Sequence, residues 1–237
     1  MIHIENINKA FGKFQVLSQI NLSFNQGACI ALIGPNGCGK TTLIKTILGM
    51  VLPDSGKIAF DGKHIAGAFE YRKHIGYMPQ IGRYPDHMNI GQIIKMVQTI
   101  RKSETPSDLD LYNAYKLEDM LHKPMRTLSG GTRQKVSAAL AFMFNPKVLI
   151  LDEPTAGLDP LASELLKEKI KHGKKKGKLI LITSHFLSEL DDLITEVVYM
   201  QEGQVRFHDP IETIQQKTSE VRISAAIGKI LKQHHNE

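Results

Sequence analysis

A glycine-rich segment that ends in a lysine and a threonine is the first feature of the sequence that could do chemistry. It reads Gly34-Pro35-Asn36-Gly37-Cys38-Gly39-Lys40-Thr41 and fits the pattern G-x-x-x-x-G-K-[ST]. Glycines let the backbone curl so that successive N–H groups point inward, and the N-terminus of a following helix adds a positive field. Such a segment binds phosphate, with the lysine at the outer phosphates and the hydroxyl on Mg²⁺. A glycine-rich turn without a ligand is the alternative, but that turn has no use for Lys40 followed by Thr41.

A pair of adjacent carboxylates, Asp152 and Glu153, is the second such feature. The pair ends the apolar run Val148–Leu151. Like charges repel and burial of a charge is unfavourable, so a buried strand has no structural reason to end in two acids. Asp152 can hold Mg²⁺ through water, and Glu153 can polarise an attacking water as a general base. The alternative, a solvated acidic turn before Pro154, stays open for the pair alone and loses weight beside the phosphate-binding segment.

The elements that must position these residues follow an α/β pattern. Imperfect alternation predicts strands before and after a turn at Phe11-Gly12, and Cys29–Ile33 is typical of a fully buried strand that leads into Gly34. A helix is expected from near Gly39 to before Leu52-Pro53. The apolar runs 148–151 and 179–182 have a helical segment between them, which predicts parallel strands in a βαβ unit.

Between these α/β segments the sequence changes character. From Ile81 to Phe144 the β-branched runs thin out and helical periodicity takes over. We therefore predict a discontinuous nucleotide-binding core of residues 1–80 and 145–218. A helical insertion of residues 81–144 interrupts it, and a short helical tail of residues 219–237 follows.

Composition excludes several classes of protein. The 237 residues are 42% hydrophobic and 23% charged, which is ordinary globular usage and excludes a disordered or collagen-like chain. Two cysteines, Cys29 and Cys38, exclude a disulfide framework or a zinc pattern. No apolar run reaches the roughly 20 residues needed to span a bilayer, and no signal peptide is visible. We expect a cytoplasmic chain that reaches a membrane only through a partner.

The net charge of +6 owes much to the lysine-rich run Lys171–Lys178. The run has two interpretations, a nucleic-acid patch or the basic end of a helix. Gly177 is typical of the position that follows a helix, and no aromatic residues interleave with the lysines for base stacking. We therefore favour a helix end and expect no nucleic-acid partner.

A Leu128-Ser129-Gly130-Gly131 motif upstream of the carboxylate pair narrows the class. With the phosphate-binding segment and the Asp-Glu strand end, it resembles the signature of ABC-type ATPases. The rest of that family's order is present: Gln80 resembles the Q-loop, Gly157–Pro160 the D-loop and His185 the switch histidine. The match covers nearly the whole chain, from about Ile2 to Gln216. Two residues depart from the usual pattern, Thr132 in place of glutamine and Cys38 in place of serine.

The resemblance implies a P-loop NTPase fold: a RecA-like α/β core with an N-terminal antiparallel β subdomain, plus a helical ABC subdomain. It also implies ATP and Mg²⁺ as cofactors, and a head-to-tail dimer in which each ATP meets the P-loop of one copy and the signature of the other. The catalytic residues implied are Gln80, Glu153 and His185, and the metal-binding ones are Thr41, Gln80 and Asp152. The residues implied to bind ATP are Phe11, Val16, Gly34, Pro35, Asn36, Gly37, Cys38, Gly39, Lys40, Thr41, Thr42, Ser129, Gly130, Gly131 and Asp159.

The partners expected from the resemblance are a second copy of the chain and a transmembrane permease, with no direct contact to cargo. The chain would then lie on the inner face of the cell membrane through the permease. An ABC ATPase that drives a soluble assembly, of the iron–sulfur scaffold type, remains the alternative. ABC proteins that act in translation or on nucleic acid usually have two fused domains or a long coiled coil, and this sequence shows neither. Residues 77–85, and residues 128–136 with 138–142, resemble the ATPase subunit of the ABC system for nitrous oxide reductase maturation.

Overall fold

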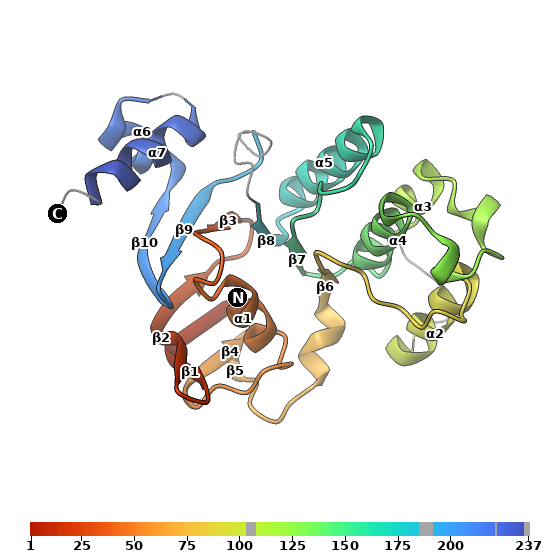
Figure 1. Ribbon diagram of the computed structural model, residues 1–237, viewed down its shortest axis with the longest axis horizontal. Coiled ribbons are helices and arrows are strands. Elements are labelled where there is room, and N and C mark those ends of the chain that lie inside the picture. The colour runs from red at the N-terminus through yellow and green to blue at the C-terminus, as the bar shows by residue number, and fades with distance from the viewer. Residues whose placement is uncertain (103–107, 185–191, 221, 235–237) are drawn as a thin grey trace. The chain divides into compact units, whose positions relative to one another are not determined.

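A computed structural model of the chain describes residues 1–102, 108–184, 192–220 and 222–234. The chain forms two compact units (Figure 1). The first unit is Met1–Phe69 with Leu181–Glu237, and the second is Glu70–Ile180. Each unit is described by itself below.

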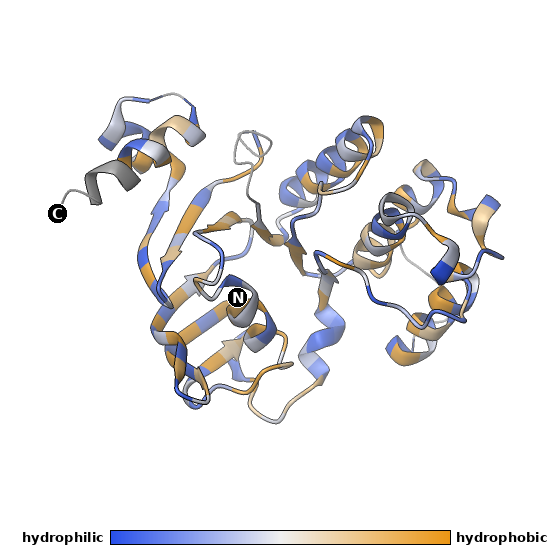
Figure 2. Ribbon diagram, in the orientation of Figure 1, coloured by the Kyte–Doolittle hydropathy of each residue, from blue (hydrophilic) through white to orange (hydrophobic). Residues whose placement is uncertain are grey.

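An antiparallel sheet opens the first unit, with the strand order β2-β1-β4-β5. Its strands are β1 (Ile2–Phe11), β2 (Phe14–Phe24), β4 (Ser55–Phe60) and β5 (Lys63–His64). The predicted alternation is confirmed, since Ile4 pairs with Leu22 and Ile7 with Ile20, and all four side chains are buried. Figure 2 shows this alternation as orange and blue bands along β1 and β2. The β1–β2 hairpin turns at Phe11–Phe14, as predicted.

The second sheet segment of the first unit has the order β10-β9-β3. Strand β3 (Cys29–Ile33) is buried along its whole length and pairs in parallel with β9 (Glu196–Gln201). Strand β9 pairs antiparallel with β10 (Gln204–Pro210). Helix α1 (Lys40–Ile47) follows the glycine-rich segment, and helices α6 (Ile211–Thr218) and α7 (Ile223–His234) end the chain. The predicted helical tail is thus confirmed over α7.

The second unit combines a parallel strand pair with most of the helices. Strand β6 (Ile75–Met78) pairs in parallel with β7 (Val148–Asp152), and β8 (Leu179–Thr183) begins beside β7. Its α-helices are α2 (Ile90–Arg101), α3 (Asp110–Ala114), α4 (Gly130–Phe142) and α5 (Pro160–Lys175). Three short 3₁₀ turns complete it: η1 (Glu70–His74), η2 (Leu117–Met120) and η3 (Met125–Thr127).

The helical character predicted for residues 81–144 is confirmed. The second compact unit, Glu70–Ile180, is larger than this predicted insertion, because α2 and α4 pack on the β6–β7 strand pair. Arg101 of α2 donates hydrogen bonds to the carbonyls of Lys73 and Ile75, at 2.9 Å each. The predicted boundaries at 80/81 and 144/145 therefore differ from the edges of the compact units and stay a prediction.

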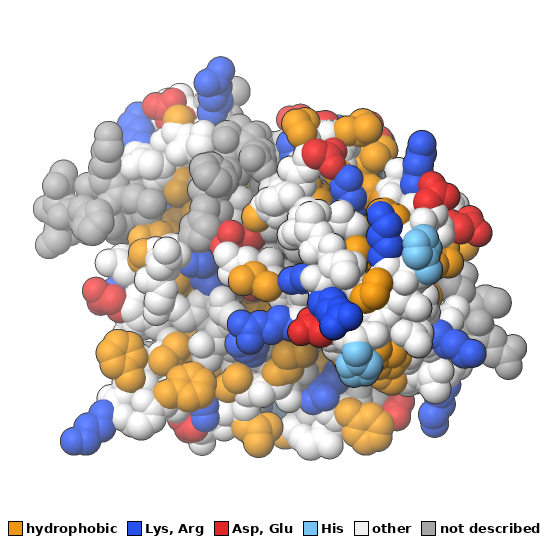
Figure 3. All heavy atoms as spheres, turned by 45° about the vertical axis from the view of Figure 1, so that its right-hand side comes forward, with side chains coloured by type: hydrophobic (Ala, Val, Ile, Leu, Met, Phe, Trp, Pro, Cys, Tyr) orange, Lys and Arg blue, Asp and Glu red, His pale blue; other side chains and the backbone are white. Residues whose placement is uncertain are grey.

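The lysine-rich run ends helix α5, as predicted. Gly177 adopts a left-handed φ of 76°, its N–H donates to Lys174, and the N–H of Lys178 donates to Gly173. These two bonds close the last turn in a Schellman motif, and the lysines lie where the helix dipole favours cations. On the face drawn in Figure 3, Lys and Arg side chains are interspersed with Asp and Glu. Every helix within the described ranges is too short or too polar to span a bilayer.

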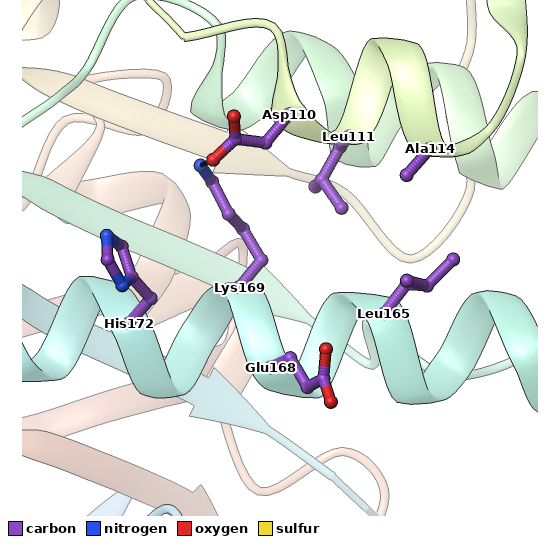
Figure 4. Close-up of a pocket in the computed structure, with 7 residues that line it drawn as sticks. All are labelled: Asp110, Leu111, Ala114, Leu165, Glu168, Lys169 and His172. Carbon is purple, nitrogen blue, oxygen red and sulfur yellow. Dashed lines mark hydrogen bonds and ion pairs between the residues drawn. The ribbon is translucent and has the colours of Figure 1, made fainter.

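A buried lysine joins α3 to α5 in the second unit. Lys169 is 8% exposed, and its ammonium donates to Asp108 at 2.6 Å and to Asp110 at 2.6 Å. The hydrogen bond from Lys169 lowers the pKa of Asp110. Figure 4 shows Asp110 and Lys169 pointing toward each other at the edge of a pocket between the two helices. No residue predicted to bind nucleotide lines this pocket.

We predict that Lys169→Met destabilises the protein by about 3 kcal/mol, because it leaves the largely buried carboxylate of Asp108 without its cation. Lys167→Met on the same helix is the matched control. Lys167 pairs with the exposed Glu164 at 2.9 Å, and such a surface pair contributes less than about 1 kcal/mol. Urea unfolding of both variants measures the difference. Equal losses of unfolding free energy would show that the Lys169 cluster stabilises the protein no more than a surface pair does.

Candidate active site

The glycine-rich segment forms a tight loop between β3 and α1. Gly34, Gly37 and Gly39 have φ values of 148°, 79° and 106°, which side chains rarely adopt. A Cβ on Gly34 would overlap the carbonyl oxygen of Met200 in β9. A Cβ on Gly39 would lie 2.7 Å from the carbonyl oxygen of Val16 in β2. The loop thus rests on the backbone of two strands of the first unit and has room for no side chain at either glycine.

The ammonium of Lys40 lies against this loop. Its Nζ donates to the carbonyl of Gly34 at 2.7 Å and to that of Pro35 at 3.1 Å. Thr41, the next residue in the first turn of α1, is exposed. The Cys38 thiol is buried 3.7 Å from Lys40 Nζ, so the departure from serine places a small side chain inside the loop. The loop therefore presents a cation, an exposed hydroxyl and a helix N-terminus together, which suits a phosphate with its metal ion.

The predicted adenine contacts belong to the same unit. Phe11, at the end of β1, is 52% exposed, and Lys9 Nζ lies 5.4 Å from its ring centroid. Val16 contacts the loop through its carbonyl at Gly39, as described above. The β1–β2 hairpin therefore holds an exposed aromatic ring on the sheet that supports the phosphate-binding loop. An exposed π-face of this kind can stack on a base.

The carboxylate pair and Gln80 lie at one edge of the strand pair in the second unit. Met78 of β6 pairs with Leu151 of β7, so the two parallel strands end side by side. Gln80 is exposed just beyond β6, and Asp152 ends β7 with 6% exposure. Burial, with the nearby charge of Asp152, raises the pKa of Tyr77 to about 12. Ligands bind at the carboxyl ends of parallel strands in such sheets.

Glu153 has an unusual backbone. Its φ is 50°, in the left-handed region that only a few per cent of residues other than glycine adopt. Its carbonyl accepts from the N–H of Ala156 at 3.1 Å, which closes a turn directly after the strand. Outliers of this kind gather at functional sites, where the surrounding structure holds them. The sequence did not predict this conformation, because it depends on the turn rather than on the residue type.

The signature motif forms the N-terminus of helix α4. Ser129 is the N-cap, and its Oγ accepts from the N–H of Thr132 at 3.2 Å. Ser129 and Gly130 are exposed, so the first amides of α4 are open to a ligand. The departure at Thr132 has a structural consequence, because its hydroxyl lies 2.9 Å from Ser129 Oγ and joins the cap. Such an N-terminus is an anion site by its amides and its dipole.

The D-loop is bound to the signature helix inside the second unit. Asp159 caps α5 through the N–H of Ala162 at 2.9 Å and pairs with Lys135 of α4 at 2.6 Å. The hydrogen bond from Lys135, together with that from Ala162, lowers the pKa of Asp159. A Cβ on Gly131 would lie 2.7 Å from the carbonyl oxygen of Gly157. The sequence did not predict this role of Lys135, because nothing in the sequence distinguishes a helical lysine that pairs with a distant aspartate from one exposed to solvent.

The predicted site residues thus fall into two sets. The first unit holds Phe11, Val16 and the loop from Gly34 to Thr42, and the second holds Gln80, Ser129–Gly131, Asp152, Glu153 and Asp159. His185 lies outside the described residues. In the first unit the ammonium and amides suit phosphate and the Thr41 hydroxyl suits Mg²⁺, and in the second unit the carboxylate and amide oxygens are hard ligands of the kind that Mg²⁺ takes.

The chain is similar to known transport proteins. A family model described as ABC transporter matches residues 17–156. A lantibiotic transport ATP-binding protein, SrtF of Streptococcus pyogenes, is 35% identical over 86% of this chain and 89% of its own. A Nod factor export ATP-binding protein I of Ralstonia nicotianae is 33% identical over 86% of this chain. The chain spans 65% of that relative's length.

Solved structures agree with the fold. An ATP-binding subunit of an ABC transporter has a TM-score of 0.88 at 26% identity, with coverage of 98% of this chain and 99% of its own. The ATP-binding cassette MJ0796, solved as a dimer in a post-hydrolysis state with ADP and Pi, has a TM-score of 0.78 at 22% identity. That alignment covers 89% of this chain and 98% of the cassette. The predicted P-loop NTPase fold class is confirmed.

We predict that Gly34→Ala destabilises the nucleotide-free protein far more than Gly37→Ala. Both glycines have positive φ, so each alanine brings backbone strain of about 1–3 kcal/mol. Only at Gly34 must the new Cβ also displace a carbonyl of β9, while nothing lies within 4 Å at Gly37. We expect Tm to fall by about 3 °C for Gly37→Ala and by about three times as much for Gly34→Ala. Equal shifts would mean that the loop does not rest on β9.

Proposed function

Because the chain belongs to the ABC transporter family and is an ATP-binding cassette, an ATPase, we propose that it is the energy-coupling subunit of a membrane transporter. The observation that carries the mechanism is that one chain has two helix N-termini whose geometry suits an anion. One is the Lys40 loop at α1, and the other is the exposed Ser129 cap of α4. A single ATP needs one phosphate cradle. Two cradles on different units suit a head-to-tail dimer with two shared ATP molecules.

The residues of the chain take separate roles in this mechanism. MgATP supplies the reacting γ-phosphate and the metal charge that neutralises it. Lys40 and the loop amides hold the β- and γ-phosphates, while Thr41, Asp152 and Gln80 would hold the Mg²⁺. Glu153 is the general base for the attacking water, and Phe11 stacks on adenine. Catalysis then comes mainly from positioning and charge stabilisation. The predicted γ-phosphate contact of His185 lies outside the described residues.

Ser129 acts on the ATP of the partner copy in this proposal. Its Oγ and the amides that follow are exposed in a single chain, and Asp159 and Lys135 hold the same end of the helix. A second copy can bring its own ATP to this helix end without any rearrangement of the cap. The MJ0796 cassette has a similar fold and was solved as a dimer, which supports the proposal that two copies pair.

A permease is the proposed membrane partner. Three large hydrophobic residues of the first unit are exposed. Met50 and Leu52 lie on the connection after α1, and Phe69 ends the segment Met1–Phe69. Exposed apolar side chains mark a protein contact where they form one contiguous patch, and we propose that these three belong to the permease contact. The similar proteins are named for lantibiotic transport and Nod factor export, which favours export. The chain would then lie on the inner face of the cell membrane.

Two finer assignments stay predictions. No described residue bears on nitrous oxide reductase maturation, because the ATPase subunit does not touch cargo. The soluble iron–sulfur assembly remains the alternative to membrane transport. Fractionation of native cells separates these functions: a transporter subunit is recovered with membrane proteins, whereas a soluble assembly ATPase is not.

We predict that Lys40→Ala and Glu153→Gln fail in different steps. Lys40→Ala should weaken ATP binding, because it removes the cation from the phosphate loop. Glu153→Gln should still bind ATP but hydrolyse it roughly 10²–10⁴-fold more slowly, the range for a lost general base. With ATP and Mg²⁺ trapped, Glu153→Gln should elute as a dimer in size-exclusion chromatography. A variant that binds ATP yet stays monomeric at high protein concentration contradicts the shared-site model.

We also predict that Ser129→Arg spares ATP binding by the monomer but prevents two such copies from dimerising, since a bulky cation then enters both shared sites. Mixing tests whether the site is shared. A Ser129→Arg copy and a Lys40→Ala copy can together form one intact site. That site combines the phosphate loop of the first copy with the signature of the second. A copy with both changes, mixed with wild type, can form none. Nucleotide trapping in a Glu153→Gln background, measured on mixed dimers isolated through a different affinity tag on each copy, should therefore appear only in the first mixture. Trapping only in the second mixture would show that Ser129 serves its own ATP.

A further inference from the structure

The segment around Gln80 packs on the signature helix at two glycines. A Cβ on Gly76 in β6 would overlap the carbonyl oxygen of Ala141 in α4. A Cβ on Gly82 would overlap the hydroxyl of Ser137 in α4 and lie 2.8 Å from the ring of Tyr84. Gln80 lies between these two glycines in the sequence. The backbone at Gly76 therefore packs directly on the helix backbone, and the backbone at Gly82 packs on the Ser137 side chain, so the segment touches α4 on both sides of Gln80.

A hydrogen bond closes the second of these contacts. Tyr84 Oη lies 2.8 Å from Ser137 Oγ, and Ser137 is 1% exposed. Burial raises the pKa of Tyr84, so its hydroxyl stays protonated and able to donate at neutral pH. A buried hydroxyl pair of this kind contributes to stability only while both partners are in place. The pair thus ties the loop after Gln80 to a fixed point on α4.

The opposite end of α4 is the signature. Ser129 caps this helix, and Ser137 and Ala141 lie further along the same rigid element. A displacement of the Gln80 segment must therefore move the Ser129 cap with it, unless the contacts at Gly76, Gly82 and Tyr84 give way. Rigid elements and packed contacts of this kind carry coupling between sites.

We propose that Tyr84 and Ser137 are positioning residues that make the Gln80 loop and helix α4 move as one body. The inference rests on the proposed function, in which Gln80 meets the chain's own ATP and Ser129 meets the partner's. The loop that contacts one ATP then sets the position of the serine that contacts the other. Binding at the two shared sites is therefore cooperative, and the hydroxyl pair is part of the reason.

The test compares Tyr84→Phe, Ser137→Ala and the double variant with wild type in steady-state ATP hydrolysis by the full chain. Each single change should lower kcat about 5- to 10-fold and move the Hill coefficient for ATP toward 1. Binding of a non-hydrolysable ATP analogue by the monomer should stay within about two-fold, since neither residue is in the phosphate loop. The double variant should lose no more than either single one, because both remove the same hydrogen bond.

Thr218→Val is the matched control for the loss of a buried hydroxyl. Thr218 is 2% exposed, and its hydroxyl donates to the carbonyl of Ile214 at 2.8 Å in α6, outside the proposed machinery. Its Tm should fall about as much as those of the single variants, roughly 2–4 °C, while kcat and the Hill coefficient stay at wild-type values. A general loss of stability would change all three variants alike.

The outcomes separate this inference from the proposed function. If wild type hydrolyses ATP cooperatively and Glu153→Gln dimerises with ATP, the proposed function stands. Single variants with wild-type kcat and Hill coefficient then overturn the positioning role. So does a double variant whose loss is the product of the single losses, or a Thr218→Val variant with the same kinetic loss. A wild type without ATP hydrolysis, or Glu153→Gln without a dimer, overturns the proposed function and this inference with it.

Discussion

Close approach of backbone to backbone at a few glycines is the constraint on which the rest of the structure depends. In the first unit, Gly34 and Gly39 bring the phosphate loop against the carbonyls of Met200 and Val16. In the second, Gly76 and Gly131 bring β6 and the D-loop against helix α4. Each contact leaves no room for a methyl group. The polar groups of the site therefore sit on backbone whose position is determined by packing, which is what a preorganised phosphate site requires.

The local chemistry of the site was readable from the sequence, and its long-range pairs were not. The phosphate loop, the acidic strand end and the Ser129 cap depend on neighbouring residues with the right spacing. Strand β3 was predicted for the same reason, since five apolar residues in a row suit a strand that is buried on both faces. The bond from Lys169 to Asp108 joins residues 61 positions apart. No spacing rule distinguishes that lysine from its solvated neighbours on α5.

The two departures from the family pattern also show that a sequence does not reveal spatial contacts. Cys38 and Thr132 are recognisable in the sequence as unusual, but their consequences are spatial. Cys38 fits because its side chain is small and buried beside Lys40. Thr132 adds a hydroxyl to the Ser129 cap, a contact that glutamine would not make in the same way. The left-handed Glu153 is a third case, because the turn after β7 imposes that conformation on a residue whose own preference is different.

Helix α4 holds a buried polar atom that the described fold does not pair. Within the described part of the chain, the Gln134 side-chain amide nitrogen is the one buried side-chain N or O atom without a hydrogen-bond partner. An unmet buried donor of this kind costs about 1–3 kcal/mol. Gln134 lies one turn before Ser137, on the helix that also holds the Lys135–Asp159 pair and the Ser129 cap. A helix selected for stability alone would carry an apolar residue there. The same helix contacts the Gln80 segment and the D-loop and carries the signature, so under the proposed function its sequence is constrained by the nucleotide site as well as by the core.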